Sequence, residues 1–138
     1  MELQLPKVAI IITNYNKEKY ISESVDSVLG QSYKGPIKII IIDDHSTDKS
    51  LSVINKIIAK HGDNVTLIKN RENYGQLRSE AIGFYSIKDA DFINFLDGDD
   101  ILLPNFIEYS IYAHLNSRKH LAFTTTDQIH FNESKIKG

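Results

Sequence analysis

Cysteine is absent from this sequence, and so is any long apolar run. Without cysteine the chain has no disulfide, no thiolate metal site and no cysteine nucleophile, a composition that suits a reducing compartment. The longest unbroken apolar run is Val8 to Ile12, far shorter than the roughly 20 residues that span a membrane. No signal peptide precedes it. We therefore expect a soluble protein with a cytoplasmic location, at most peripheral to the inner face of the membrane.

The sequence also has no excess of basic residues. The net charge is −2 and the lysines are scattered, so the sequence does not predict a basic surface that would bind nucleic acid. Hydrophobic residues make up 41% and charged residues 25% of the chain, which are ordinary globular values. The 138 residues are enough for one domain with a real core. We expect residues 1–138 to form a single domain.

Short runs of β-branched residues alternate with helical patterns along the chain. "VAIII" at 8–12 and "IIII" at 39–42 are bounded by polar residues and predict strands that are buried on both faces, as in a parallel sheet. Between them, "EKYISESVDSVLGQS" has the period of a helix with one apolar face. The inward residues of that helix are predicted to be Ile21, Val25, Val28 and Leu29.

The same alternation continues through the rest of the chain. Further helices are predicted over 49–60, over 76–85 and from Pro104 to Ser117, with Gly62 ending the first of these. Further strands are predicted at 65–68, 92–96 and 121–125. Strands alternating with helices predict an α/β fold with a mostly parallel sheet and right-handed crossovers.

Polar clusters follow three of the predicted strands, and ligands of open parallel sheets bind at the carboxyl ends of the strands. In "IIDDHSTD", Ser46, Thr47 or Asp48 can cap the next helix. Capping needs only one acidic group, so Asp43 and Asp44 side by side are explained equally well as ligand contacts. In "TNYNKEKY", Tyr15 is either a stacking surface for a base or an ordinary loop aromatic.

The strongest signal is "LDGDD", with three carboxylates within four positions after a buried strand. Asp-Gly is also a favoured turn pair, which is the simpler interpretation. However, two unit charges about 4 Å apart repel by roughly 4 kcal/mol at an effective dielectric near 20. A hard divalent cation offsets that repulsion, and Mg²⁺ usually takes one or two protein carboxylates and completes its shell with water and phosphate oxygens. The pattern favours a metal site at Asp97 and Asp99.

Taken together, these segments resemble a known family. The order "VAIIITNYNKEKYISESVDSVLGQSY", "IIIIDDHSTDKS", "NYGQ…GF" and "FINFLDGDDILLPNF" is similar to the N-terminal, nucleotide-sugar-binding part of the family 2 glycosyltransferases. The resemblance covers most of residues 7–108. It implies the GT-A fold, a Rossmann-like sheet flanked by helices, and a chain that stops before the acceptor-binding half.

The resemblance also implies roles for individual residues. Thr13 and Tyr15 would hold the base, and Asp44, with Asp43 beside it, would bind the pyrimidine. Arg78 would take the role of an arginine that lies near the diphosphate in many members of the family. In the "D-x-D" motif, Asp99 would be the main ligand of Mn²⁺ or Mg²⁺. Asp97 would assist at the metal or the ribose. His45 takes the place of a glycine that is usual in the family.

The implied reaction moves a sugar from a nucleoside diphosphate, by resemblance UDP, to a hydroxyl of a saccharide or lipid-linked saccharide acceptor, with inversion. Bacterial surface polysaccharide synthesis is the setting that the family suggests. We find no counterpart of the family's catalytic base before Gly138. The alternative is therefore a module that binds nucleotide sugar and metal without catalysing transfer.

Other functional classes are disfavoured by missing motifs. A phosphoacceptor signalling domain would need its acidic pair after the first strand, where this chain has "TNYN". A dinucleotide-binding fold would need G-x-G-x-x-G at that position. A nucleotidyltransferase would need a glycine-rich basic loop there.

Overall fold

The computed structural model describes residues 4–118, 130–132 and 135–137. Within them, four parallel strands form one sheet in the order β3-β2-β1-β4, and a separate antiparallel pair joins β5 (His130–Asn132) and β6 (Lys135–Lys137). The four strands are β1 (Val8–Asn14), β2 (Ile37–Asp43), β3 (Val65–Lys69) and β4 (Phe92–Asp97). The helices are α1 (Ile21–Leu29), α2 (Ser50–His61), the short 3₁₀ helix η1 (Gly62–Asn64), α3 (Gln76–Ser86) and α4 (Phe106–Asn116).

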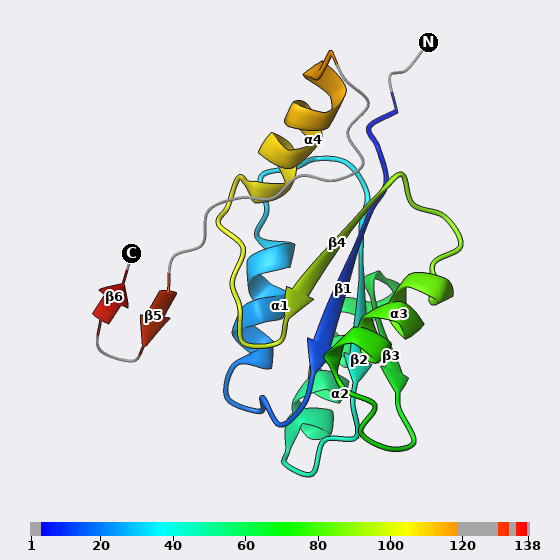
Figure 1. The fold of residues 1–138 in the computed structure, drawn as a ribbon, viewed down its shortest axis with the longest axis vertical. Coiled ribbons are helices and arrows are strands. Elements are labelled where there is room, and N and C mark those ends of the chain that lie inside the picture. Colours follow the sequence, from blue (N-terminus) through cyan, green and yellow to red (C-terminus); the bar gives the residue numbers. More distant parts are fainter. Residues whose placement is uncertain (1–3, 119–129, 133–134, 138) are drawn as a thin grey trace.

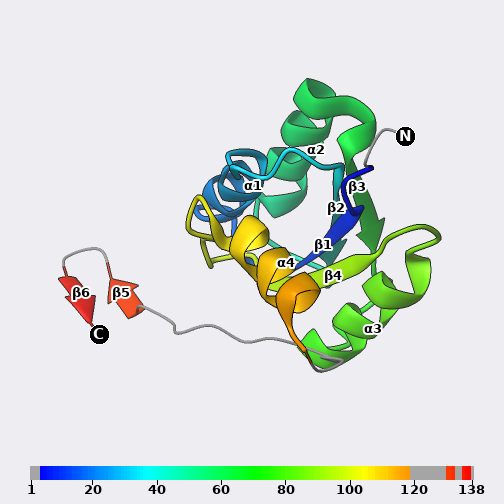
Figure 2. The same ribbon diagram turned by 90° about the horizontal axis from the view of Figure 1, so that it is seen from above.

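The helices lie on both faces of the sheet. Figure 2 shows α1 and α2 on one side and α3 on the other. The chain steps outward from β1 to β2 to β3, and then returns past β1 to form β4. Because parallel crossovers are right-handed, a reversal of direction along the sheet moves the connecting helix to the opposite face. The predicted α/β fold with a parallel sheet flanked by helices is confirmed.

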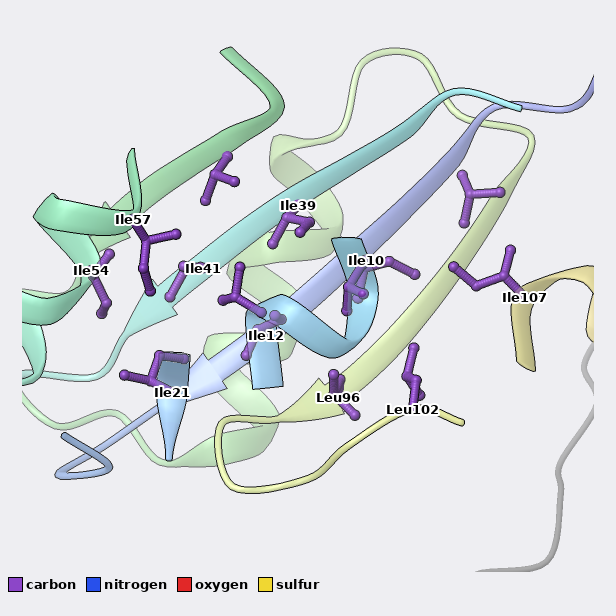
Figure 3. Close-up of a cluster of buried hydrophobic side chains, with 14 of the residues drawn as sticks. Ile10, Ile12, Ile21, Ile39, Ile41, Ile54, Ile57, Leu96, Leu102 and Ile107 are labelled. Atoms are coloured by element: carbon purple, nitrogen blue, oxygen red, sulfur yellow. The ribbon is translucent and has the colours of Figure 1, made fainter. Parts of the chain in front are cut away.

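The main core lies between the sheet and the α1–α2 face. Ile10 and Ile12 of β1, with Ile39 and Ile41 of β2, point into this layer (Figure 3), and all four are fully buried. The α1 residues Ile21, Val25 and Val28, the α2 residues Ile54 and Ile57, and the α4 residues Ile107 and Ile111 complete it. The alternate residues of the strands face the other way, as the period of two requires.

The opposite face carries a smaller core beneath α3. Ile11, Ile40 and Ile42 are its buried members. Helix α3 packs closely there because Gly83 has no side chain: a Cβ at this position would lie 2.5 Å from Cγ2 of Ile11. Because β1 and β2 are covered on both faces, their apolar runs consist almost entirely of isoleucine and valine.

Most predicted elements occur with shifted ends. Strands β1, β2 and β4 extend beyond their apolar runs to include Thr13, Asn14, Asp43 and Asp97, because parallel pairing continues through these polar residues. Leu29 was predicted to point inward but is 38% exposed, since the last residue of the helix lies roughly 80° around the axis from Ile21.

At the carboxyl side, helix α4 begins at Phe106, after a turn that contains Pro104. The strand predicted at 121–125 lies outside the described residues. No helix in the described part of the chain is long and apolar enough to cross a membrane.

Candidate functional site

The four strands of the sheet point to the same end of the molecule (Figure 1). Neighbouring strands β1 and β4 are connected in opposite directions, so the sheet has its topological switch point between them, where open α/β sheets bind ligands. A pocket of about 250 Å³ opens at this place. Its lining comes from the ends of three strands and the loops that follow them, from the loop before α3 and from the start of α3: Thr13, Asn14, Tyr15, Lys17, Asp44, Asn73, Gly75, Gln76, Ser79, Asp97, Gly98 and Asp99.

Asp97 ends β4 opposite Thr13 of β1. Its Oδ1 accepts a hydrogen bond from the Thr13 hydroxyl at 3.2 Å and from Nε2 of Gln76 at 2.6 Å. Both hydrogen bonds go to Oδ1. No hydrogen bond to the second oxygen, Oδ2, is made by the residues that the structure describes.

Asp99 lies two residues further along and is exposed at the pocket mouth. Its Oδ2 forms an ion pair with Nζ of Lys17, which reaches it from the loop after β1. The side chains of both partners are about one third exposed, at 36% for Lys17 and 37% for Asp99. Lys17 thus neutralises one carboxylate of the pocket.

Gly98 separates the two carboxylates and passes close to β1. Its N–H donates to the carbonyl of Thr13 at 2.8 Å, and a Cβ at this position would lie 2.9 Å from that carbonyl oxygen. Such contacts are shorter than real side chains allow. The approach of β4 to β1 therefore requires glycine between Asp97 and Asp99.

Asn14, which lines the pocket, and Asp43 behind it form a buried polar pair. Asp43 is fully buried, and its Oδ1 accepts a hydrogen bond from Nδ2 of Asn14 at 2.8 Å while its Oδ2 accepts the N–H of Ser46 at 3.1 Å. Oδ1 of Asn14 is buried without a hydrogen-bond partner among the described residues. Asp43 does not line the pocket, so it orients Asn14 and the loop after β2.

Asp44 fixes the loop before α3. Its carboxylate accepts hydrogen bonds from Nδ2 of Asn70 and from the N–H groups of Tyr74 and Gly75, each at 2.8 Å. Burial alone would raise the pKa of Asp44, but the hydrogen bonds from Asn70, Tyr74, Gly75 and the Ser79 hydroxyl outweigh it and lower that pKa below its ordinary value of 3.8. Asp44 is therefore ionised at neutral pH and rigidly held at the pocket wall.

The loops after β1 and β2 are braced against each other beside this pocket. Oδ1 of Asn16 accepts the N–H of Thr47 at 2.8 Å, and the N–H of Lys49 donates to Glu18 at 2.6 Å. A neighbouring hollow of about 300 Å³ lies between the two loops, with Glu18 and Asp48 in its lining. The carboxylates of Glu18 and Asp48 accept backbone hydrogen bonds. They therefore hold the two loops together beside the pocket.

Of the predicted nucleotide-binding residues, Thr13, Tyr15, Asp44 and Asp97 line one pocket, and the predicted metal ligand Asp99 lies with them. Tyr15 is 44% exposed and offers a free ring surface. Arg78 lies outside the lining on α3, where its guanidinium covers the ring of Tyr74 at 3.9 Å from the centroid. The nucleotide and metal contacts of all these residues stay predictions, and Asp43 and Arg78 lie outside the pocket lining.

The sequence predicted no role for Asn73, Gln76 and Ser79, which also line the pocket. Gln76 and Ser79 are near the start of α3, and Asn73 precedes Gly75. The signal was present in Gly75, which has φ +81 and ψ 162, a combination that essentially only glycine adopts. A glycine of this kind marks a loop whose backbone bends sharply, here toward Asp44.

Asp97 and Asp99 are the residues that could hold a cation. Hard cations such as Mg²⁺ prefer carboxylate oxygens and often take only one or two from the protein. Within residues 4–118 and the two short strands, no group of three His, Cys, Asp or Glu side chains could hold a metal ion. The donor set fits an ion whose remaining ligands are water and phosphate, and does not fit one bound by protein alone.

The sequence and fold were then compared with known proteins. The model of "Glycosyl transferase family 2" matches residues 9–137. The chain belongs to glycosyltransferase family 2. Its relative EpsE of Bacillus subtilis, named as a glycosyltransferase, is 34% identical over 133 residues, which are 96% of this chain and 47% of EpsE.

Solved structures of GT-A glycosyltransferases share the fold. S. aureus TarS 1–349, crystallised with UDP-GlcNAc, has a TM-score of 0.68 at 24% identity over 78% of this chain and 31% of TarS 1–349. The mannosyltransferase PcManGT of Pyrobaculum calidifontis, in complex with GDP-Man and Mn²⁺, has a TM-score of 0.71 at 21% identity over 82% of this chain and 33% of PcManGT. This chain spans less than half the length of EpsE and of both these structures.

Proposed function

We propose that the pocket between β1 and β4 binds a nucleoside diphosphate sugar together with Mn²⁺ or Mg²⁺, and that residues 1–138 form the donor-binding domain of a glycosyltransferase. The observation that carries the proposal is the gathering of Asp44, Asp97 and Asp99, from two separate strand ends, around one pocket that also contains an exposed tyrosine. Family membership supports the reaction class, transfer of a sugar to an acceptor hydroxyl.

The base lies on the β1–β2 side of the pocket in this proposal. Tyr15 presents an exposed ring on which a flat base can stack. Asp44, ionised and fixed, accepts an N–H of the base, and Thr13 lies at the same wall. We favour UDP over GDP because of the family resemblance and because TarS was crystallised with UDP-GlcNAc.

The diphosphate lies on the β4 side, next to Asp97 and Asp99. Oδ2 of Asp97 accepts no hydrogen bond within the described residues, since both donors use Oδ1. With the carboxylate of Asp99, this oxygen supplies two ligands for a divalent cation, and phosphate oxygens supply others. A cation bound there stabilises the charge that develops on the departing diphosphate.

Transfer with inversion needs a base that deprotonates the acceptor hydroxyl, a saccharide or a lipid-linked saccharide by family resemblance. Asp44, Asp97 and Asp99 are the acidic residues of the described pocket lining, and each has a role in donor binding here. None of these three is thus assigned as the base. That observation favours a second candidate function, a module that binds nucleotide sugar and metal without transferring the sugar.

Calorimetric titration of the 138-residue chain with UDP, GDP and their sugars, with and without Mn²⁺, tests the proposal. We expect UDP to bind more tightly with Mn²⁺, and Asp99→Ala to abolish the metal-dependent part of the affinity. Equal affinity with and without Mn²⁺ for every nucleotide would overturn the proposal. A donor hydrolysis or transfer assay on the same protein then separates the enzyme from the binding module.

A further inference from the structure

Lys17 forms an ion pair with Asp99, one of the two proposed metal ligands. Its ammonium pairs with Oδ2 of Asp99, and both residues line the pocket. The two groups come from different loops, one after β1 and one after β4. The pair therefore closes across the mouth of the pocket.

The backbone of Lys17 is fixed by hydrogen bonds, and its side chain ends in the ion pair with Asp99. The N–H of Lys17 donates to the hydroxyl of the buried Ser50 at 3.1 Å, and its carbonyl accepts the N–H groups of Tyr20 and Ile21 at 2.9 and 3.0 Å. The flexible four-carbon stem of lysine carries a compact charge that can exchange partners. The Lys17 side chain is 36% exposed, so solvent reaches it.

We propose that Lys17 is a displaceable counter-ion of Asp99, which opposes metal binding to the empty pocket and moves to the diphosphate when donor and metal bind together. This inference rests on the proposed function. A divalent cation bound to Asp99 repels the Lys17 ammonium and replaces it at the carboxylate. Binding of the metal alone therefore breaks the Lys17–Asp99 ion pair, which weakens that binding. A diphosphate provides the released ammonium with a new partner.

The consequence is coupling between the two ligands. Each ligand tightens the binding of the other by the same factor, because coupling between binding sites is reciprocal. Removal of the ammonium removes part of this coupling. The affinity for metal alone then rises, while the affinity for the nucleotide falls.

The test uses the 138-residue chain and its Lys17→Met variant. Binding of Mn²⁺ alone is followed by the electron paramagnetic resonance signal of free Mn²⁺, and binding of UDP by calorimetry with and without Mn²⁺. An exposed ion pair contributes up to about 1 kcal/mol, so Lys17→Met should bind Mn²⁺ alone about fivefold more tightly. The factor by which UDP tightens Mn²⁺ binding should fall by at least about the same amount.

Lys7→Met is the matched control. Lys7 forms the other Lys–Asp ion pair of the described residues, with Asp89, and does not line the pocket. Its loss should leave every binding constant unchanged. Lys17→Arg, which keeps the charge, should retain most of the coupling, and circular dichroism verifies that each variant is folded.

The measurements distinguish failure of the inference about Lys17 from failure of the proposed function. If Lys17→Met binds Mn²⁺ alone no more tightly than the unmodified chain, or keeps the full coupling, Lys17 is not a displaceable counter-ion and the inference is wrong. If the unmodified chain binds UDP, GDP and their sugars equally with and without Mn²⁺, the proposed function itself is wrong, whatever Lys17→Met does.

Discussion

Replacement of Asp44 by asparagine should destabilise the fold, because this carboxylate ties β2 to the loop before α3. Asparagine has nearly the same shape and keeps one oxygen, which can still accept from Asn70 and from the Tyr74 N–H. Its amide NH₂ replaces Oδ2 and faces the N–H of Gly75, a second donor. The variant therefore tests the charge and the acceptor while it preserves packing.

The magnitude follows from these contacts. A hydrogen bond to a charged group contributes about 1.5–3 kcal/mol and a neutral one about 0.5–1.5 kcal/mol, so each retained bond weakens by roughly 1 kcal/mol. Loss of the acceptor for Gly75 costs about 1–3 kcal/mol, and the lower end applies because Oδ1 of Asn73 lies 3.1 Å from the same N–H. The free energy of unfolding should fall by about 3 kcal/mol in total.

Urea unfolding followed by far-ultraviolet circular dichroism at pH 7 measures this change. With a slope near 2 kcal/mol per molar urea, the midpoint should fall by about 1.5 M. Asp26→Asn, at an exposed position of α1, is the matched control and should change the free energy by less than about 0.5 kcal/mol. If Asp44→Asn is as stable as Asp26→Asn, the carboxylate does not hold this loop and the described frame of the pocket is wrong.

The effect should depend on pH. Because the pKa of Asp44 is lower in the folded chain than its ordinary value of 3.8, the unfolded chain binds the proton first as the pH falls. The stability that Asp44 contributes is therefore fully present above the unfolded pKa and is lost as the pH falls through the folded pKa. The difference between the unmodified chain and Asp44→Asn should narrow in acid, and a constant difference from pH 7 to pH 2 would contradict this origin.

Substitutions at three further positions each test a single feature. Gly83→Ala, normally stabilising in a helix, should lower the free energy of unfolding by about 1–3 kcal/mol, because its Cβ would lie 2.5 Å from Ile11; an increase in the urea midpoint would contradict the close packing of α3. His45 has φ +64, a left-handed conformation that glycine adopts easily and valine does not. His45→Val should therefore lower the free energy of unfolding by roughly 1 kcal/mol, and His45→Gly should not. Equal urea midpoints for these two variants would argue against a left-handed backbone at this position. Gly98→Ala should weaken calorimetric UDP binding in Mn²⁺ roughly tenfold by shifting the carboxylates, with unchanged affinity as the contrary result.

The sequence predicted the central strands β1 and β2 well because they are buried on both faces. Continuous apolar runs at 8–12 and 39–42, rich in β-branched residues, leave little alternative to parallel strands. The ends of the strands were predicted less well, since hydrophobic patterns stop where polar residues begin. Asn14 and Asp43 are paired across β1 and β2 although neither is apolar, because their buried side chains hydrogen-bond to each other.

The site was predicted only where its residues follow strands. Asp44, Asp97 and Asp99 were found because strand ends in a parallel sheet meet at one edge. Gln76 was missed because its contact with Asp97 depends on the path of the loop before α3, which Asp44 fixes through hydrogen bonds of long sequence separation. The pairing of Lys17 with Asp99 depends on the same kind of long-range geometry.

A crystal structure of the chain with UDP and Mn²⁺ tests the central claim most directly. Anomalous scattering from manganese locates the ion independently of the model for the nucleotide. We predict one strong anomalous peak within bonding distance of Asp97 or Asp99 and of the diphosphate, with the base against Tyr15 and Asp44. An ion or a nucleotide bound away from the β1–β4 pocket would contradict the account.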